Sequence, residues 1–374
     1  MHGSIQKRVG KQGTRWCAVY DEPTPDGKRR QRRKTFKTKR EAESHLAKTV
    51  HEIQTGEYVE PSRMRVAEYL ESWLASIGSS VKPSTLYSYR SVVRGHLVPK
   101  LGHILLAKLT PLAVQGACQH MLDEGFAAST VRLRHTVLHR ALEQAVHWRM
   151  VPRNAADGVK VPSGEAKETK TWTAAEARKF LSATAENDLA SLWRLALDTG
   201  MRLGELVALR WADFDLDARK VAVRRTLTRN DRGGWIIGDQ TKSASGRRSI
   251  AVGQSSVAAL LTHRARQNER RLHLGSEWQD LDLVFDRRDG GRCSPATIQR
   301  AFRAAIEAAD VPLIRFHDQR HTAATLLLEE GIHPKVVQER LGHANIAITL
   351  DRYSHVGMHL QHEAASRLEE LLGS

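Results

Sequence analysis

The first part of the chain alternates apolar and polar side chains in the manner of β-strands. Residues 15–20 are rich in strand-forming side chains, and a second strand is expected over residues 30–36 after a turn-forming cluster of Pro, Asp and Gly. Thr38 is followed three residues later by Glu41, a capping box that predicts the start of a helix. Residues 1–60 are therefore predicted to form a small domain of sheet and helix.

After this domain the spacing of apolar side chains becomes helical. The first helix carries a stripe of apolar residues: Val66, Tyr69, Leu70, Trp73, Leu74 and Ile77. Three more helices are expected to begin near Pro83, Pro111 and Ser129, because proline and serine favour helix starts. We predict an all-helical module over residues 64–155, followed by a Pro- and Gly-containing linker over residues 152–170.

The rest of the chain, residues 168–374, is predicted to form one larger and mostly helical domain. Two β-rich stretches interrupt its helical pattern, at residues 220–228 and 235–250. The expected fold class is therefore mainly α with small β elements (α+β), arranged in three domains.

The charge balance indicates an anionic partner. The chain has 58 Lys and Arg against 42 Asp and Glu, which gives a formal net charge of +16. A surplus of this size favours nucleic acid or an anionic membrane. The sequence contains no apolar run of about 18 residues, so we expect neither a membrane span nor a membrane partner. The N-terminus also lacks the apolar stretch of a secretory signal.

Cysteine usage and missing motifs narrow the functional classes. Cys17, Cys118 and Cys293 lie far apart and lack the spacing of a disulfide framework or a zinc site. Neither a phosphate-binding Gly-x-x-x-x-Gly-Lys-Ser/Thr loop nor a His-Glu-x-x-His motif is present. We expect a cytoplasmic, nucleoid-associated protein.

Basic side chains are concentrated in two places. Residues 28–40 carry nine of them, flanked by Trp16, Tyr20 and Phe36, which favours a folded basic sheet over a solvated tail. The fourth helix of the helical module adds further arginines. The candidate DNA contacts are Lys28, Arg29, Arg30, Arg32, Arg33, Lys34, Lys37, Arg132 and Arg134.

Three separated clusters carry side chains suited to phosphate chemistry. Residues 199–206 read Thr-Gly-Met-Arg-Leu-Gly-Glu-Leu, residues 317–321 read His-Asp-Gln-Arg-His, and His343 and Tyr353 follow. Arginine forks can hold the non-bridging oxygens of a phosphodiester. The two histidines of the second cluster have the i,i+4 spacing of a zinc pair, so a zinc hydrolase is a minority alternative.

These clusters, in this order and with Leu-Gly-His before the tyrosine, resemble the tyrosine recombinase (phage integrase) family. The resemblance extends over essentially the whole chain and implies an arm-binding, a core-binding and a catalytic domain. It implies six catalytic residues: Arg202, Lys242, His317, Arg320, His343 and Tyr353. Glu205 falls on a supporting acidic position, and His321 is expected to be structural. Lys242 is assigned within a hairpin segment where Arg247 and Arg248 are close neighbours.

The chemistry implied by this resemblance explains the residue types. Tyr353 would attack a DNA phosphate and form a 3′-phosphotyrosine, with His317 as base and Lys242 as the acid that protonates the leaving 5′-oxygen. The two arginines and His343 would stabilise the transition-state charge, each by about 3–4 kcal/mol. The phosphoester bond energy is retained, so no ATP, metal or cofactor is expected.

The expected function is site-specific integration of a mobile element or prophage. The expected partners are double-stranded DNA with core-type and arm-type attachment sites, three further copies of the chain in a tetramer on DNA, an excisionase and a DNA-bending host protein. A helix after Tyr353 has an apolar face that would pack in cis or in trans. The alternatives are a type IB topoisomerase and a non-enzymatic DNA-binding protein.

Overall fold

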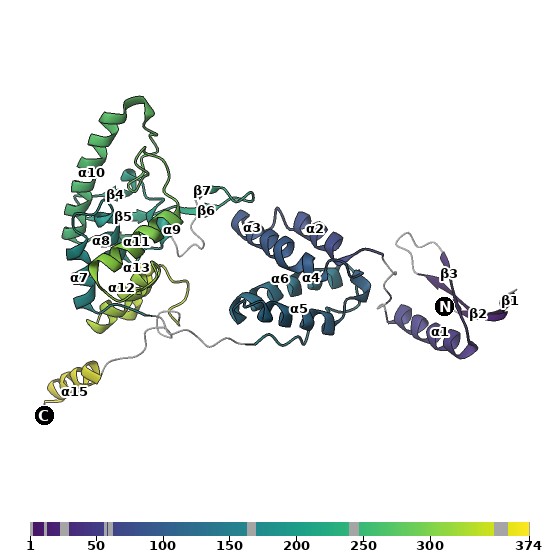
Figure 1. Ribbon diagram of the computed structural model, residues 1–374. Helices are drawn as coiled ribbons and strands as arrows, with labels where there is room; N and C mark the ends of the chain where they lie inside the picture. The colour runs from purple at the N-terminus through teal and green to yellow at the C-terminus, as the bar shows by residue number, and fades with distance from the viewer. Residues whose placement is uncertain are drawn as a thin grey trace. The chain divides into compact units, whose positions relative to one another are not determined.

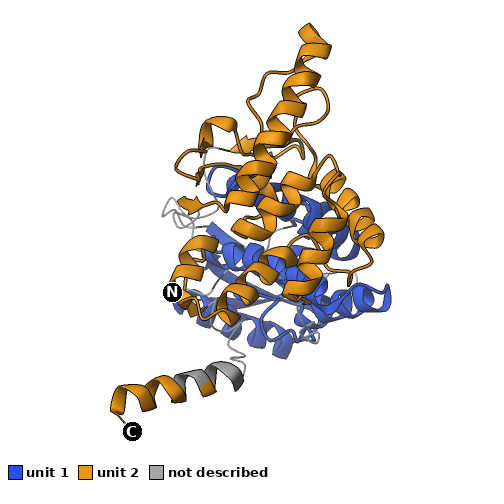
Figure 2. Cartoon of the chain, turned by 90° about the vertical axis from the view of Figure 1, so that its left-hand side faces the viewer, with its two compact units in different colours: residues 1–165 blue, residues 166–374 orange. Residues whose placement is uncertain are grey.

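In the computed structural model the chain forms two compact units, residues 1–165 and 166–374 (Figures 1 and 2). The division falls within the linker expected over residues 152–170. The boundary expected between the first two domains lies within unit 1 and stays a prediction. The residues that the structure describes are 3–10, 13–22, 30–55, 58, 63–162, 170–238, 247–347 and 358–373.

Unit 1 begins with an antiparallel sheet and a helix. The sheet has the order β1 (Ser4–Gly10), β2 (Gly13–Glu22), β3 (Arg30–Phe36), and α1 follows over Lys39–Gln54. Both predicted strands are confirmed, as is the capping box, in which Glu41 N donates to Thr38 Oγ1 at 3.2 Å. The first strand was not predicted, because its apolar side chains do not form a buried stripe: Val9 is 76% exposed.

Helix α1 covers one face of this sheet. The rings of Tyr20 and Phe36 lie 6.0 and 5.1 Å from the ring of His45 on α1. Neighbouring residues along a strand point to opposite faces. Val19 pairs with Arg33. Each of them lies an odd number of residues from the aromatic residue on its own strand, Tyr20 or Phe36. The side chain of Arg33 therefore points to the face opposite α1.

The second part of unit 1 is helical, as predicted. Its elements are α2 (Val66–Ser76), α3 (Pro83–Val92), the π-helix η1 (Val93–Leu97), α4 (Val98–Leu101), the 3-10 helix η2 (Leu106–Lys108), α5 (Pro111–Asp123) and α6 (Ala128–His147). Their core includes Tyr69, Trp73, Leu138 and Leu142, each at most 1% exposed.

The second helix of the module contains a π turn, and the fourth helix starts differently from the prediction. After α3 the helix continues through the π turn into α4, which ends at Leu101. Pro99 has no N–H to donate to the preceding turn, and a π turn accommodates this loss. Helix α6 starts at Ala128 after Ala127, which makes no side-chain cap, so Ser129 is not its capping residue.

Unit 2 is mostly helical and contains two small sheets. Its helices are α7 (Ala174–Ala183), α8 (Ala190–Thr199), α9 (Leu203–Leu206), η3 (Trp211–Asp213), α10 (Gln254–Leu274), η5 (Gly275–Glu277), α11 (Pro295–Ala309), α12 (Asp318–Glu329), α13 (Pro334–Leu341) and α15 (Met358–Leu372). Its strands are β4 (Phe214–Asp215), β5 (Lys220–Val223), β6 (Thr226–Arg229), β7 (Trp235–Gly238) and β8 (Arg248–Ala251). Strands β4, β5 and β8 form one sheet, and β6 and β7 form a hairpin (Figure 1).

The two predicted β-rich stretches each divide between these sheets. Residues 220–228 contribute β5 to the three-stranded sheet and most of β6 to the hairpin. Residues 235–250 contribute β7 to the hairpin and most of β8 to the sheet. The expected fold class, mainly α with small β elements, is confirmed.

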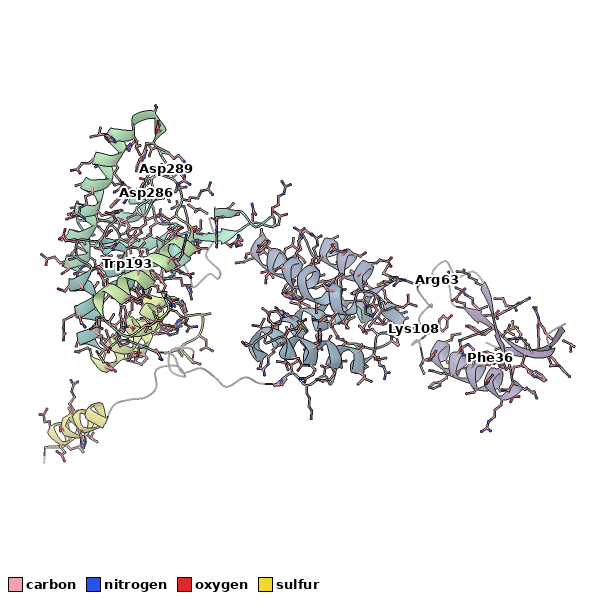
Figure 3. All side chains as sticks on the ribbon, in the orientation of Figure 1. Phe36, Arg63, Lys108, Trp193, Asp286 and Asp289 are labelled. Carbon is pink, nitrogen blue, oxygen red and sulfur yellow. The ribbon has the colours of Figure 1, made fainter. Side chains whose placement is uncertain are left out.

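A group of aromatic rings fixes the helices of unit 2. The ring of Trp193 lies on α8 (Figure 3). Its centroid is 5.4 Å from that of Phe302 on α11 and 6.0 Å from that of Phe316, just before α12. Trp172 closes the group by donating through Nε1 to Pro312 O at 2.7 Å. Such rings bury much apolar surface and pack in specific orientations. The packing holds the end of α8 close to the start of α12, where two of the motifs lie.

None of the helices in the described part of the chain has the length and apolar character that crossing a bilayer requires.

Candidate active site

The first motif forms a tight turn between two helices. Helix α8 ends at Gly200, whose φ of +62° is left-handed, and Arg202 occupies the N-cap position of α9. A Cβ at Gly200 would collide with the side chain of Leu341 on α13. A Cβ at Gly204 would come within 2.7 Å of Thr226 Oγ1 on β6. The two glycines of the motif therefore allow the neighbouring elements to approach Arg202 closely.

Arg202 contacts both its own helix and the loop that carries His343. Its Nη1 donates to Glu205 Oε1 at 2.9 Å, and its Nη2 donates to Gly342 O at 3.5 Å. Its side chain remains 38% exposed, so part of that side chain is accessible to a substrate.

The second motif lies at the start of α12. Asp318 accepts hydrogen bonds from Arg315 N, Nε and Nη2 at 2.8, 2.9 and 2.7 Å, which fixes the first turn of the helix. Arg320 is 3% exposed, and its Nη1 donates to Gly200 O at 2.8 Å. Because Gly200 lies two residues before Arg202, this bond brings the two arginines of the motifs to the same turn.

His317 precedes α12 and packs edge-on against His321, with the ring centroids 5.1 Å apart. Desolvation and then the positive charges of Arg320 and Arg202 hold the pKa of His317 below its usual range, against the opposing effect of Asp318. Its ring is therefore mainly neutral near pH 7 and able to accept a proton. His321 is 4% exposed, and the structural role expected for it stays a prediction.

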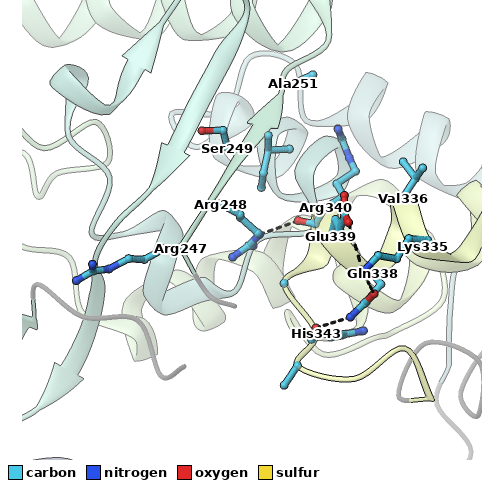
Figure 4. Close-up of a pocket in the computed structure, with 13 residues that line it drawn as sticks. Arg247, Arg248, Ser249, Ala251, Lys335, Val336, Gln338, Glu339, Arg340 and His343 are labelled. Carbon is cyan, nitrogen blue, oxygen red and sulfur yellow. Dashed lines mark hydrogen bonds and ion pairs between the residues drawn. The ribbon is translucent and has the colours of Figure 1, made fainter. Parts of the chain in front are cut away.

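His343 lies directly after the left-handed Gly342, which ends α13 (Figure 4). Its N–H donates to Gln338 O at 3.1 Å, and Gln338 Nε2 donates to His343 O at 3.0 Å. The side chain of His343 is 8% exposed and borders a pocket of about 560 Å³ between α13 and β8.

Glu205 is almost fully buried, at 3% exposed, between two arginines. Arg248 Nη2 donates to Glu205 Oε2 at 2.9 Å, opposite the contact from Arg202. Burial favours a higher pKa for Glu205, but the two arginines outweigh it and hold that pKa below its usual range. Glu205 is therefore a carboxylate that accepts hydrogen bonds from two guanidinium groups.

The structure brings five of the predicted site residues together: Arg202, Glu205, His317, Arg320 and His343. Lys242 and Tyr353 lie outside the described residues. Sequence reasoning missed the role of Arg248, which it treated only as a neighbour of Lys242. A signal was present, because Arg248 alternates with the apolar Ile250, and side chains two apart on a strand share a face.

Most of the predicted DNA contacts in the N-terminal sheet are at the surface. Arg30, Arg33, Lys34 and Lys37 are exposed, whereas Lys28 and Arg29 lie outside the described residues. Arg30 and Arg32 also approach the buried Glu22, at 3.7 and 2.8 Å. Part of the basic run therefore forms ion pairs within the domain.

Arg134 differs from the expectation that it lies on a DNA-facing surface. Its side chain stacks over Phe126 at 3.8 Å, its Nη2 lies 3.0 Å from His96 Nε2, and it is 4% exposed. The predicted contact at Arg134 is therefore corrected: this arginine packs inside the helical module. Arg132, two residues earlier, is exposed and remains a candidate.

The described residues do not gather a third metal ligand around His317 and His321, as a zinc hydrolase would require. In this part of the chain, converging ligand atoms are found on His139, Glu143 and Asp157 of unit 1. His139 Nε2 and Asp157 Oδ1 are hydrogen-bonded to each other at 2.9 Å. This contact holds the segment around Asp157, which follows α6, against that helix. The group belongs to unit 1, whereas the candidate active site belongs to unit 2.

A cluster of arginine and histidine side chains at helix ends, on a mostly helical domain, is suited to bind the phosphate groups of a nucleic acid. Residues 170–359, just over half of the chain, match the phage integrase family. Residues 66–122 match its N-terminal SAM-like domain, and residues 5–53 match an arm DNA-binding domain. The chain belongs to the phage integrase family and is a tyrosine-type site-specific DNA recombinase.

Relatives match nearly the full length of the chain. It is 28% identical over 359 residues to a tyrosine recombinase XerC-like protein of Caldanaerobacter subterraneus subsp. tengcongensis, covering 91% of this chain and 92% of the relative. It is 26% identical over 351 residues to the ICEBs1 integrase of Bacillus subtilis, covering 92% and 94%.

Solved structures share the fold. The integrase of transposon Tn1549, in complex with a circular intermediate DNA, matches with a TM-score of 0.68 at 21% identity, covering 82% of this chain and 99% of that one. The lambda integrase tetramer bound to a Holliday junction matches with a TM-score of 0.56 at 20% identity, covering 90% and 91%.

Proposed function

We propose that this recombinase integrates a mobile element or prophage by cutting and rejoining DNA through a phosphotyrosine at Tyr353. The observation that carries the proposal is the convergence of Arg202 and Arg320 on one turn, beside the loop of His343. Three nitrogen-bearing side chains from distant segments would surround a single phosphate there. Similarity to the ICEBs1 integrase of Bacillus subtilis and to a putative prophage phiRv2 integrase of Mycobacterium tuberculosis supports this role.

The two arginines would act on the scissile phosphate. Attack on a phosphodiester raises negative charge on its non-bridging oxygens, and guanidinium forks hold such oxygens with paired hydrogen bonds. Because these donors are fixed before the reaction, each contributes about 3–4 kcal/mol to transition-state stabilisation. His343 would add a further donor from the end of α13.

Proton transfers would fall to His317 and Lys242. A tyrosine hydroxyl has a pKa of about 10, so it needs a base or a positive pocket to become a nucleophile. His317 is suited to the base role, because its neighbours keep the ring neutral at pH 7. Lys242 would protonate the 5′-oxygen as it leaves, and a 5′-hydroxyl of the partner DNA would later reverse the step.

DNA binding would involve both parts of unit 1. In the N-terminal sheet, Arg8 pairs with Arg15, and Arg33 pairs with Val19, four residues further along β2. The three arginines therefore lie on the same face of the sheet, opposite α1. These three exposed arginines are suited to contact arm-type DNA, in keeping with the arm DNA-binding match. The helical module, with Arg132, would contact core-type DNA.

The assembly on DNA is proposed to be a tetramer that acts with an excisionase and a DNA-bending host protein in the nucleoid. The lambda integrase tetramer on a Holliday junction supports this stoichiometry. Leu371 and Leu372 of α15 are 83% and 74% exposed in the single chain. Such leucines would be buried if α15 packs on a neighbouring protomer, so we favour the trans arrangement over the cis one.

A suicide substrate with a nick next to the cleavage site tests the function. The native chain should form a covalent adduct, visible as a shifted band in denaturing electrophoresis. Tyr353→Phe should form none and still bind DNA with an unchanged Kd, because only the attacking oxygen is removed. An adduct formed by Tyr353→Phe would refute the assignment, and plasmid relaxation without strand exchange would favour a topoisomerase.

A further inference from the structure

Arg248 connects three parts of the candidate active site. Its side chain is 7% exposed at the start of β8. Its Nη1 and Nη2 donate to Glu205 Oε1 and Oε2 at 3.4 and 2.9 Å. Its Nε donates to Arg340 O at 2.7 Å (Figure 4). The planar guanidinium thus holds a carboxylate on one side and a backbone carbonyl on the other.

The carbonyl of Arg340 belongs to the last turn of α13, two residues before Gly342. The side chain of Arg340 in turn donates to Asp198 O and Oδ1 at 2.7 and 2.8 Å. Asp198 lies at the end of α8 and accepts from Gly253 N at 2.8 Å. Arg248 is therefore part of a chain of contacts that joins the loop of His343 to the turn that carries Arg202.

The charges in this network determine whether Arg202 can bind an anion. Arg202 and Glu205 alone would form a neutral pair, and the carboxylate would compete with a phosphate for the guanidinium. Arg248 supplies a second cation to the same carboxylate, so the three groups together carry a net positive charge. Glu205 can then orient Arg202 without neutralising it, and the guanidinium of this partly exposed side chain remains able to bind an anion.

We propose that Arg248 is a positioning residue, which balances the charge of Glu205 so that Arg202 can hold the scissile phosphate. The proposal rests on the proposed function, because it takes Arg202 as a phosphate-binding residue. Arg248 itself does not touch the substrate in this scheme. It also fixes α13, through Arg340 O, at the distance that allows Arg202 to reach Gly342 O.

A substrate with a neutral scissile group can distinguish a positioning role of Arg248 from a purely structural one. In a methylphosphonate substrate, one non-bridging oxygen is replaced by a neutral methyl group. The need for cationic stabilisation then falls, so a defect that acts through Arg202 becomes smaller. A defect caused by loosened packing lowers the rate equally on both substrates.

The experiment measures single-turnover cleavage of both suicide substrates by the full chain. We expect Arg248→Gln to lose about 100-fold on the phosphate, the effect of removing one preorganised donor, and less than about 10-fold on the methylphosphonate. Arg248→Lys keeps the charge without the fork and should be intermediate. The matched control is Arg225→Gln, which breaks the ion pair of Arg225 with buried Asp213 in the same unit. Its phosphate-to-methylphosphonate ratio should equal that of the native chain.

A compensating change provides a second readout. If Glu205 captures Arg202 once Arg248 is lost, then neutralising that carboxylate should release Arg202. We expect the double variant Glu205→Gln, Arg248→Gln to cleave the phosphate about 10-fold faster than Arg248→Gln alone. A variant with only a packing defect would become slower, because a second buried contact is lost.

The outcomes separate this inference from the proposed function. Equal losses on both substrates for Arg248→Gln, with no gain in the double variant, would overturn the positioning role of Arg248. Arg202→Ala serves as the reference for the underlying function. If Arg202→Ala cleaved the phosphate at the native rate, the proposed phosphate-binding role of Arg202 would itself be wrong.

Discussion

Replacing Gly200 by alanine tests how the fold forms the turn that carries Arg202. This glycine has a φ of +62°, and an added Cβ would collide with Leu341 Cδ2. Leu341 is fully buried and cannot swing into solvent. The carbonyl of Gly200 also accepts the hydrogen bond from Arg320 at 2.8 Å. The substitution therefore combines backbone strain with a collision beside a site residue.

The loss of stability can be worked out from the backbone strain and the collision. A left-handed φ costs a residue with a Cβ about 1 kcal/mol relative to glycine. Overpacking against a fixed side chain adds about 1–3 kcal/mol. The free energy of unfolding of unit 2 should therefore fall by about 2–4 kcal/mol, which corresponds to an increase of about 30- to 900-fold in the opening equilibrium.

Hydrogen exchange measured by mass spectrometry can assign this loss to unit 2. Peptides from α8 and α11 should lose protection, whereas peptides from α2 and α6 in unit 1 should not. Gly331→Ala is the matched control, because Gly331 has a φ of +73° and open space around its Cα. It should cost about 1 kcal/mol, the backbone strain alone.

A rescue variant isolates the collision. Leu341→Ala removes the atoms that the new Cβ would meet, so the double variant should lose less than the sum of the two single variants. If Gly200→Ala is no more destabilising than Gly331→Ala, the close approach of α13 to this turn is wrong.

Three further predictions concern pH and domain function. Burial and the charge of Arg134 lower the pKa of His96, so protons bind to the unfolded chain more readily than to the folded one. Hydrogen-exchange protection of the helical module should therefore be complete above about pH 6.5 and decline below it. The decline should be weaker in His96→Asn. The pKa of His317 is lowered as well, so the acid limb of the cleavage rate should lie below about pH 6.5, and a limb above that value would count against His317 as the base. Deleting residues 1–60 should abolish arm-site binding in a gel-shift assay and leave core-site cleavage intact, whereas unchanged arm-site binding would contradict the role of the sheet.

Features encoded locally could be predicted from the sequence. The capping box at Thr38 and Glu41 depends on residues three apart, and it forms as expected. The turn around Arg202 is also encoded locally, because its two glycines permit the left-handed backbone and the close approach of β6. The order of the motifs along the chain, through the family resemblance, also identified site residues that lie more than a hundred positions apart.

Features that depend on distant partners could not be predicted in this way. Arg134 looks like a surface arginine in sequence, but Phe126 and His96, from other elements, enclose it. The role of Arg248 depends on Glu205 and on the last turn of α13, which come together only in the folded domain. A basic residue that alternates with apolar ones on a strand is the sequence feature to examine for such buried pairs.

The site residues lie at helix ends for a physical reason. His317 occupies the N-cap position of α12, Arg202 that of α9, and His343 directly follows the end of α13. At a helix end the backbone changes direction, so a side chain can extend toward a ligand while its helix stays packed in the core. The N-terminus of α12 also carries a partial positive charge, which disfavours protonation of His317 and favours an anion nearby. The same helix packing therefore determines both where these side chains lie and which charge they attract.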